Sequence, residues 1–252
     1  MRVPRRHAPA HVLLFRHTPP PAPGSGTALV AVMDPAMIGP EHTACLSEAE
    51  RQQAERFRFE KDAIHWRACR AALRMFLARA HGISAAEVTL EFGEFGKPTM
   101  VRTLGLTGPL LHFNLSHCRD LVVIALCGEG PVGVDIEPLD RATSLLGCED
   151  AFCHPDEISR LPAEEMPRAV RLLDIWTRKE ALLKALGTGM SLAPQTVSVA
   201  NAPHGYAADP RLRDFRLHVV GAPWLGRHVV RLATPSSVPE TGLTIRHWPN
   251  DL

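Results

Sequence analysis

The sequence has no surplus of charge of either sign and no long hydrophobic run. Its 252 residues include 28 Lys and Arg and 27 Asp and Glu, which gives a formal net charge of +1 at pH 7. Proteins that bind nucleic acid through its phosphates need a surplus of basic side chains, so this balance argues against such a partner. The longest apolar runs, such as 121–127, are far shorter than the ~20 residues of a membrane-spanning helix. The sequence therefore predicts neither a nucleic-acid partner nor a membrane span.

Signals for export and for cysteine pairing are also absent. The apolar run 11–15 follows a basic segment, but it is shorter than the ~7–15-residue core of a secretory leader. The six cysteines are scattered and include no C-x-x-C pair, so they indicate free thiols and not a disulfide framework. We therefore expect a cytoplasmic protein that works in a reducing compartment.

The chain does contain an α+β pattern, and this pattern occurs twice. Hydrophobic residues make up 45% and charged residues 22%, the balance of a globular protein. Each half offers one long helix and several strands in mostly antiparallel order, and the segment 128–131 is the best candidate for the boundary. We predict an N-terminal subdomain over 1–129, whose residues 1–28 are a Pro-rich extension, and a C-terminal subdomain over 130–252.

Turn and capping signals place the expected elements. Ser47 and Glu50 form a capping box at a helix start, and Gly82 ends a helical stretch that can divide near 57–59. The proline-containing tail is expected to be loosely held. Helices are expected over 47–80 and 168–186, and strands over 11–15, 28–33, 87–92, 111–116, 121–126, 132–139, 196–201, 215–220 and 228–234.

Two acidic residues lie close together in the strand expected over 132–139. Residues two apart in a strand share a face, so Asp135 and Glu137 point one way while Val134 and Ile136 point the other. Adjacent carboxylates repel each other, and a hard divalent cation such as Mg²⁺ relieves that repulsion. The alternative is an amphipathic strand whose polar face is in water.

The second long helix also has a polar face whose side chains could bind a ligand or take part in catalysis. Thr177, Glu180 and Lys184 stand three and four positions apart, so they lie on one side of the helix. Glu180 could supply a third carboxylate or act as a base, and Lys184 could hold a phosphate. The alternative is a surface Glu–Lys pair, which contributes only about 0.3–0.5 kcal/mol.

Further polar residues stand in loops and on the first long helix. Ser116 and His117 stand where a strand ends and enters a short loop, and without a G-x-S-x-G elbow they suit phosphate binding better than a hydrolase. The alternative is an Asn/Ser pair that stabilises the turn. Lys97 sits in the turn 95–98, which lacks the frame of a Walker loop. Arg67 and Arg70 belong to a basic stripe that could cradle an anion, or could simply face solvent.

Four motifs follow one another along the chain: FGKP, FNLSH, VGVDIE and WTRKEALLK. In this order and at these separations the sequence resembles the Sfp-type 4′-phosphopantetheinyl transferase family, over roughly 47–190. The family pattern is G-K-P, then N-x-S-H, then G-x-D-x-E, then W-x-x-K-E-x-x-x-K. The resemblance implies a pseudo-dimer of two similar α/β subdomains in one chain, with the active site in the cleft between them. A monomer would therefore suffice.

The resemblance also implies a reaction and a set of site residues. The 4′-phosphopantetheine arm of coenzyme A would pass to a serine of an apo carrier protein, an acidic four-helix partner expected to dock near the C-terminal half. Mg²⁺ is the implied cofactor, and Mn²⁺ accepts the same oxygen ligands. The implied roles are metal binding by Asp135, Glu137 and Glu180; proton removal by Glu180; phosphate binding by Lys184; and coenzyme A binding by Lys97, Ser116 and His117 together with Arg67 or Arg70.

Two other functions stay open on the same residues. One is a non-catalytic module that binds coenzyme A or a carrier protein, and it predicts binding without turnover. The other is a different Mg²⁺ enzyme, such as a phosphohydrolase, which would release phosphate from simple esters. Carrier proteins of fatty acid, polyketide, nonribosomal peptide and lysine pathways all stay open as the partner.

Overall fold

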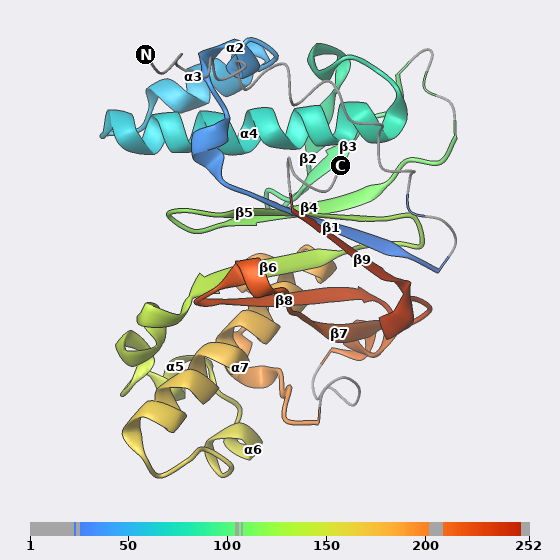
Figure 1. Ribbon diagram of the computed structural model, residues 1–252. Coiled ribbons are helices and arrows are strands. Elements are labelled where there is room, and N and C mark those ends of the chain that lie inside the picture. Colours follow the sequence, from blue (N-terminus) through green and yellow to red (C-terminus); the bar gives the residue numbers. More distant parts are fainter. Residues whose placement is uncertain (1–22, 24–25, 104–105, 107, 202–208, 248–252) are drawn as a thin grey trace, which may run out of the picture.

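Four layers make up the part of the chain that the structure describes, residues 23, 26–103, 106, 108–201 and 209–247 of a computed structural model (Figure 1). Two β-sheets pack against each other, and one long helix covers the outer face of each sheet. Within these ranges no helix is both long and apolar enough to cross a membrane. The strand expected over 11–15 lies outside the described residues.

The first sheet has four strands in the order β4, β5, β1, β9. Their bounds are His112–His117, Val122–Cys127, Ala28–Met33 and Leu243–His247. Strand β1 pairs antiparallel with β5 and parallel with β9. Helix α4 (Glu60–His81) packs on the outer face of this sheet, where Leu29 and Ile124 meet Leu73 and Phe76.

The second sheet has three antiparallel strands in the order β6, β8, β7. Their bounds are Gly133–Pro138, His228–Pro235 and Phe215–Val220. Helix α7 (Glu165–Leu186) packs on the outer face of this sheet, where its Leu182 and Ala185 join a core with Leu217 and Ala233.

Shorter elements complete the two halves. The remaining α-helices are α2 (Pro40–Thr43), α3 (Glu48–Glu55), α5 (Glu149–Phe152) and α6 (Pro155–Ile158), and β2 (Leu90–Phe92) pairs with β3 (Pro98–Met100). Short 3-10 helices of three to seven residues cover Pro35–Met37, Ala85–Glu87, Leu139–Leu145, Gly189–Ser191, Pro194–Thr196, Pro210–Asp214, Pro223–Leu225 and Glu240–Gly242.

The core between the two sheets sets the direction of the acidic side chains. Val30 and Val32 of β1 and Val134 and Ile136 of β6 are almost fully buried in one cluster. Successive side chains in a strand point to opposite faces. Asp135 and Glu137 therefore face away from this core, toward α7. The apolar alternation of β6 therefore aims its carboxylates at the second long helix.

Several sequence-based expectations are confirmed in the first half. The Ser47 hydroxyl accepts a hydrogen bond from the backbone N–H of Glu50, and the Glu50 carboxylate accepts one from the backbone N–H of Ser47, so the capping box is present. The helical stretch is divided in two, since α3 ends at Glu55 and α4 begins at Glu60. Gly82 ends α4 in the left-handed conformation, with φ of 68°.

Two expectations for the second half are wrong. Residues 196–201 form no strand, although Val197 and Val199 are buried. The backbone N–H of Val199 donates instead to the buried Glu157 carboxylate at 2.6 Å, so a side chain takes the place of a neighbouring strand. The tail is not loosely held throughout, because β9 adds to the first sheet beside β1, where Leu243 and Ile245 pack against the core between the sheets.

A buried histidine makes the stability of the second sheet pH-dependent. His218 of β7 is only 2% exposed; its Nε2 lies 2.8 Å from the Thr234 hydroxyl, and its Nδ1 has no hydrogen-bond partner among the described residues. Burial, with a smaller contribution from Arg216, lowers the pKa of His218 from 6.5 to about 4. Between these values the unfolded chain binds a proton that the folded protein does not, so stability falls as pH falls.

We expect the free energy of unfolding to be lower at pH 5 than at pH 7 by about 2 kcal/mol from this histidine. Urea denaturation at the two pH values measures the difference. The His218→Gln variant should be less stable than the wild type at pH 7, but its free energy of unfolding should fall less between pH 7 and pH 5. An equal loss in the wild type and in this variant would show that another group is responsible.

Candidate active site

Helix α7 lies directly on β6 because residue 133 has no side chain. A Cβ atom added at Gly133 would lie 2.1 Å from the carbonyl oxygen of Ala181 and 2.2 Å from the backbone nitrogen of Ala185. Only glycine allows backbones to approach this closely. The contact brings the face of α7 that carries Glu180 and Lys184 against the acidic side of the strand.

A lysine, an aspartate and a serine from three different elements form one network. Lys184 donates to Asp135 Oδ1 at 2.6 Å and to the Ser116 hydroxyl at 3.0 Å. The Ser116 hydroxyl donates to the same Asp135 oxygen at 3.0 Å and accepts from the backbone N–H of Ile136 at 3.3 Å. The end of β4 is thereby fixed to β6 and to the last turn of α7.

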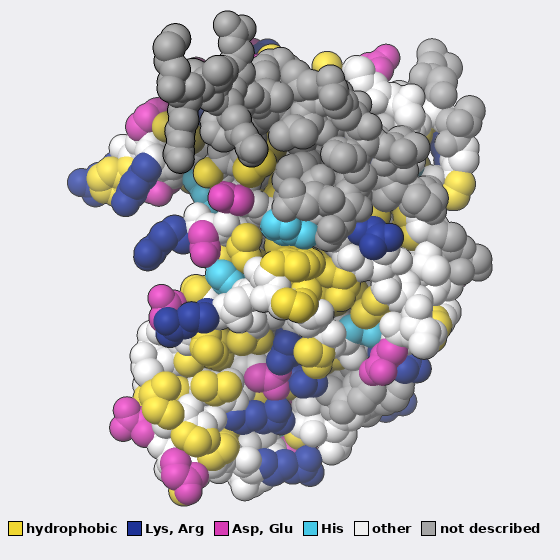
Figure 2. All heavy atoms as spheres, in the orientation of Figure 1, with side chains coloured by type: hydrophobic (Ala, Val, Ile, Leu, Met, Phe, Trp, Pro, Cys, Tyr) yellow, Lys and Arg dark blue, Asp and Glu magenta, His cyan; other side chains and the backbone are white. Residues whose placement is uncertain are grey.

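A cavity of about 460 Å³ opens beside this network. Figure 2 shows the surface indented on one side between the α4 half and the α7 half, with basic, acidic and histidine side chains at its border. Most of the site residues predicted from the sequence line this cavity: Arg70, Ser116, His117, Asp135, Glu137, Glu180 and Lys184. The two halves of the molecule thus share one pocket.

The three carboxylates of the cavity suit a divalent cation. Asp135 is 4% exposed, and its Oδ2 has no hydrogen-bond partner within the described ranges, while Oδ1 is already bound by the network. Desolvation raises the pKa of Glu137, and the nearby charge of Asp135 raises it further. Desolvation also raises the pKa of Glu180, with added repulsion from both other carboxylates. Concentrated, partly dehydrated negative charge with an orphaned oxygen fits a cation with oxygen ligands.

Lys97 lies apart from the cavity lining. Its ammonium group donates to the carbonyl oxygen of Val132 at 3.1 Å and to that of Ala185 at 2.8 Å. Burial lowers the pKa of Lys97 to about 8. In this structure the side chain therefore ties the β2–β3 turn of the first half to β6 and α7 of the second.

The two arginines predicted to bind coenzyme A have different surroundings. Arg67 forms an ion pair with Glu60 and does not line the cavity. The Arg70 guanidinium lies over the rings of Trp66 and Phe92, 5.3 Å and 5.5 Å from their centroids. Arg70 also lines a neighbouring cavity of about 600 Å³, so it stands where two cavities adjoin.

Two tryptophans of the cavity carry no role in the sequence-based prediction. Trp176 donates through Nε1 to Glu137 at 3.1 Å, and Trp66 supports Arg70. Each stands four positions before a predicted site residue, Glu180 or Arg70, on the same helix face. That spacing is the signal that could have found them.

The other lysine of the WTRKEALLK motif serves the fold. Lys179 is 1% exposed, and its ammonium group lies 2.6 Å from the Glu157 carboxylate. It also donates to the carbonyl oxygens of Phe152 and Pro194 at 2.7 Å and 3.0 Å. The adjacent positions 179 and 180 therefore point in different directions from α7, Lys179 into the core and Glu180 into the cavity.

Two protein-family models match the chain. Residues 40–129 match the model described as 4′-phosphopantetheinyl transferase, N-terminal, and residues 131–230 match the model of the 4′-phosphopantetheinyl transferase superfamily. The two matches adjoin and together contain all of the residues that line the cavity.

Curated relatives carry consistent names. A putative 4′-phosphopantetheinyl transferase of Synechocystis is 31% identical over 153 residues, 60% of this chain and 61% of the relative. A phosphopantetheinyl transferase of Thraustochytrium is 34% identical over 167 residues, 62% of this chain and 57% of the relative. The 4′-phosphopantetheinyl transferase Sfp of Bacillus subtilis is 25% identical over 154 residues, 61% of this chain and 66% of the relative. The chain thus spans about three fifths of the length of these relatives.

Proposed function

Because this chain belongs to the 4′-phosphopantetheinyl transferase superfamily, we propose that it transfers the 4′-phosphopantetheine arm of coenzyme A to a serine of an apo carrier protein. The other product is 3′,5′-ADP. The observation that supports the proposal best is the shared cavity, which is lined by three carboxylates from β6 and α7, by Lys184, and by the serine and histidine at the end of β4.

The reaction is a phosphoryl transfer and needs no enzyme nucleophile. The serine oxygen of the carrier protein forms a bond to the phosphorus next to pantetheine, and the bond from that phosphorus to the ADP oxygen breaks. Such reactions depend mainly on positioning and on charge stabilisation. A cavity that offers cationic side chains and a cation site meets both needs.

Glu180 is the proposed acceptor of the serine proton. In the metal-free protein desolvation raises the pKa of Glu180, and its carboxylate lines the cavity that the carrier serine would enter. It lines the cavity together with Asp135 and Glu137. These three residues would hold Mg²⁺, or Mn²⁺ in its place, and the bound cation would neutralise charge on the pyrophosphate.

Cationic and hydrogen-bonding side chains of the cavity would hold the phosphates of coenzyme A. Lys184 lies beside Asp135 and can bind oxygens of the breaking bridge. Ser116 and His117 end β4 at the cavity wall, and we propose that His117 binds the 3′-phosphate. Arg70 extends this surface and lies 3.6 Å from the Glu50 carboxylate, whereas Arg67 and Lys97 lie off the cavity and would have to leave their present partners to reach a ligand.

The architecture and the cysteines support the proposed subdomains, oligomeric state and cellular compartment. Each sheet has its own helix and core, which supports subdomains 1–129 and 130–252 with β9 crossing back to the first sheet. Both walls of the cavity come from one chain, which supports a monomer. All six cysteines are free, which supports a reducing, cytoplasmic compartment. The proposed partners are coenzyme A and an apo acyl or peptidyl carrier protein.

Intact-mass spectrometry tests the proposed activity. The protein is incubated with coenzyme A, Mg²⁺ and several purified apo acyl and peptidyl carrier proteins. We expect a carrier to gain the mass of one phosphopantetheine arm, and we expect a chelator to prevent the gain. Coenzyme A bound tightly with no mass gain on any carrier would replace the proposal with a binding module. Phosphate released from simple esters without a carrier would replace it with a phosphohydrolase.

A further inference from the structure

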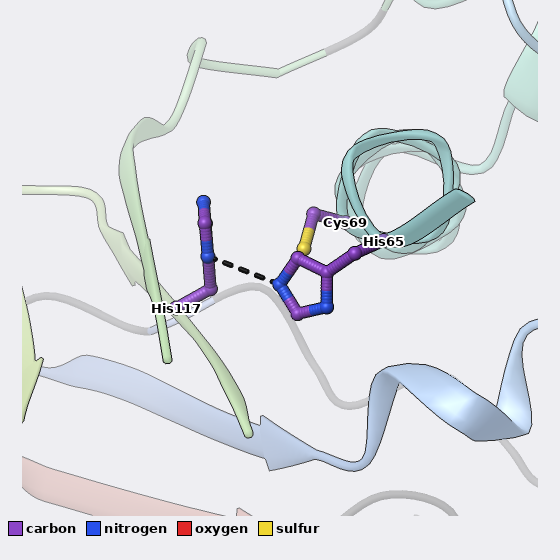
Figure 3. Close-up of side chains that lie close together, drawn as sticks. All are labelled: His65, Cys69 and His117. Carbon is purple, nitrogen blue, oxygen red and sulfur yellow. Dashed lines mark hydrogen bonds between the residues drawn. The ribbon is translucent and has the colours of Figure 1, made fainter. Parts of the chain in front are cut away.

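Three potential metal ligands meet at the wall of the cavity on the α4 side. His65 and Cys69 stand four positions apart on α4, so they lie on one face of the helix, and His117 reaches them from the end of β4 (Figure 3). Their ligand atoms all lie within 4.8 Å of one another. None of the carboxylates proposed for Mg²⁺ belongs to this group.

The two imidazoles are already close enough to share a cation. His65 Nε2 lies 3.1 Å from His117 Nδ1, which is hydrogen-bond distance, so one proton can lie between the two nitrogens. In a tetrahedral zinc site with Zn–N bonds of about 2.0–2.1 Å, two ligand nitrogens stand about 3.3 Å apart. The separation of the two nitrogens is therefore close to the one that a metal ion needs, and each ring has to turn so that its lone pair points at the metal and no longer at the other ring.

The third ligand gives the group a preference among metals. Cys69 is 1% exposed and lines the cavity with His117. Burial raises the pKa of the Cys69 thiol to about 12, so without a metal it stays protonated. Burial, and then the nearby charges of His65 and Lys184, lower the pKa of His117 and keep that imidazole neutral, the form that binds metals. Thiolate and imidazole together select Zn²⁺ and similar ions over Mg²⁺.

We propose that His65, Cys69 and His117 form a binding site for Zn²⁺ or a similar transition-metal ion. Three protein ligands leave the fourth position of the tetrahedron open, as in zinc sites that exchange a ligand. Since His117 and Cys69 line the cavity, the open position faces it. The site is separate from the acidic Mg²⁺ site and belongs to the wall where coenzyme A would lie.

A second group of residues offers similar ligand atoms but is less suited to binding a metal ion. The ligand atoms of Cys118, Asp120 and His228 also lie within 4.8 Å of one another. There the Cys118 thiol donates to Asp120 Oδ1, and His228 Nε2 lies 3.1 Å from the same oxygen, so the carboxylate already satisfies both partners. This group therefore provides a matched control.

A consequence for coenzyme A follows, and it rests on the proposed function. His117 cannot bind a metal ion and a coenzyme A phosphate through the same ring at the same time. Zn²⁺ and coenzyme A should therefore weaken each other's binding by the same factor. Zn²⁺ at this site would inhibit the enzyme, and coenzyme A would protect it.

Cobalt substitution tests the site without any transfer assay. Co²⁺ is added to the reduced 252-residue protein in the absence of coenzyme A, and the absorption spectrum is recorded. We expect a thiolate-to-cobalt charge-transfer band and the intense visible bands of tetrahedral Co²⁺. Both should disappear in Cys69→Ala and persist in Cys118→Ala. A band that persists in Cys69→Ala, or disappears only in Cys118→Ala, overturns the assignment.

The histidine ligands and the link to coenzyme A need two further measurements. In His65→Ala we expect the affinity for Zn²⁺, measured by competition with a chromogenic chelator, to fall at least about 10-fold, while thermal unfolding confirms that the variant is folded. An unchanged affinity overturns the site. Saturating coenzyme A should release Co²⁺ from the wild type, and a spectrum that coenzyme A leaves unchanged overturns the shared use of His117. Neither result depends on whether a carrier protein is modified, so failure of the transferase proposal is seen separately.

Discussion

Replacing Asp135 with asparagine is expected to lower the rate of phosphopantetheine transfer by at least about 100-fold while the protein stays folded. The amide has the shape of the carboxylate, and its oxygen can still accept from Lys184 and from the Ser116 hydroxyl. The amide nitrogen then occupies the place of Oδ2, the buried oxygen that has no partner within the described ranges. A donor there repels the cation that the carboxylate would attract, so both the charge and one ligand are lost.

The rate is measured as a function of Mg²⁺ concentration, with a nearby carboxylate as the control. Asp140 is exposed, follows β6 by two residues and does not line the cavity. Asp140→Asn should therefore match the wild type, while Glu180→Gln should lose activity as Asp135→Asn does. A rate for Asp135→Asn within about threefold of the wild type at every Mg²⁺ concentration would remove this residue from the metal site. Thermal unfolding of each variant shows that the fold is retained.

The acidic part of the cavity could be predicted because its geometry is local. The strand period places Asp135 and Glu137 on one face, and the helix period places Glu180 and Lys184 on another. The structure adds only how these two faces meet, through the close approach of α7 to β6 at Gly133. The two long helices and most strands could be predicted for the same reason, since their apolar periods and capping residues lie within the segment itself.

The parts that the sequence did not reveal depend on contacts between distant segments. Lys97 reads as an exposed lysine in a turn, yet its ammonium group binds carbonyl oxygens 35 and 88 positions further along the chain. Residues 196–201 alternate like a strand, but the buried Glu157 takes the N–H of Val199. Strand β9 finds its partner more than 200 positions earlier, in β1. Periodicity within a segment carries no information about such partners.

Among the glycines of the described structure, Gly133 of β6 is expected to tolerate an added methyl group least. In Gly133→Ala the new Cβ would lie 2.1–2.2 Å from backbone atoms of Ala181 and Ala185, and backbone atoms have no side-chain rotamer through which to yield. Strand and helix must therefore separate. We expect the free energy of unfolding to fall by about 3 kcal/mol or more, because side-chain repacking cannot relieve the overpacking here. This loss corresponds to a fall in melting temperature of about 10 °C.

The separation should also disable the site, because α7 carries Glu180 and Lys184 away from Asp135. Calorimetry and the transfer assay, performed below the melting temperature of the variant, should therefore show both losses. Gly221→Ala is the matched control, since a Cβ at Gly221 meets no atom within 4 Å in the described structure; its stability should stay within about 0.5 kcal/mol of the wild type. If Gly133→Ala melts with the wild type, the helix is not held against β6 as described. If it melts early but retains full activity, the contact supports the fold alone, and the carboxylates and Lys184 find one another by another route.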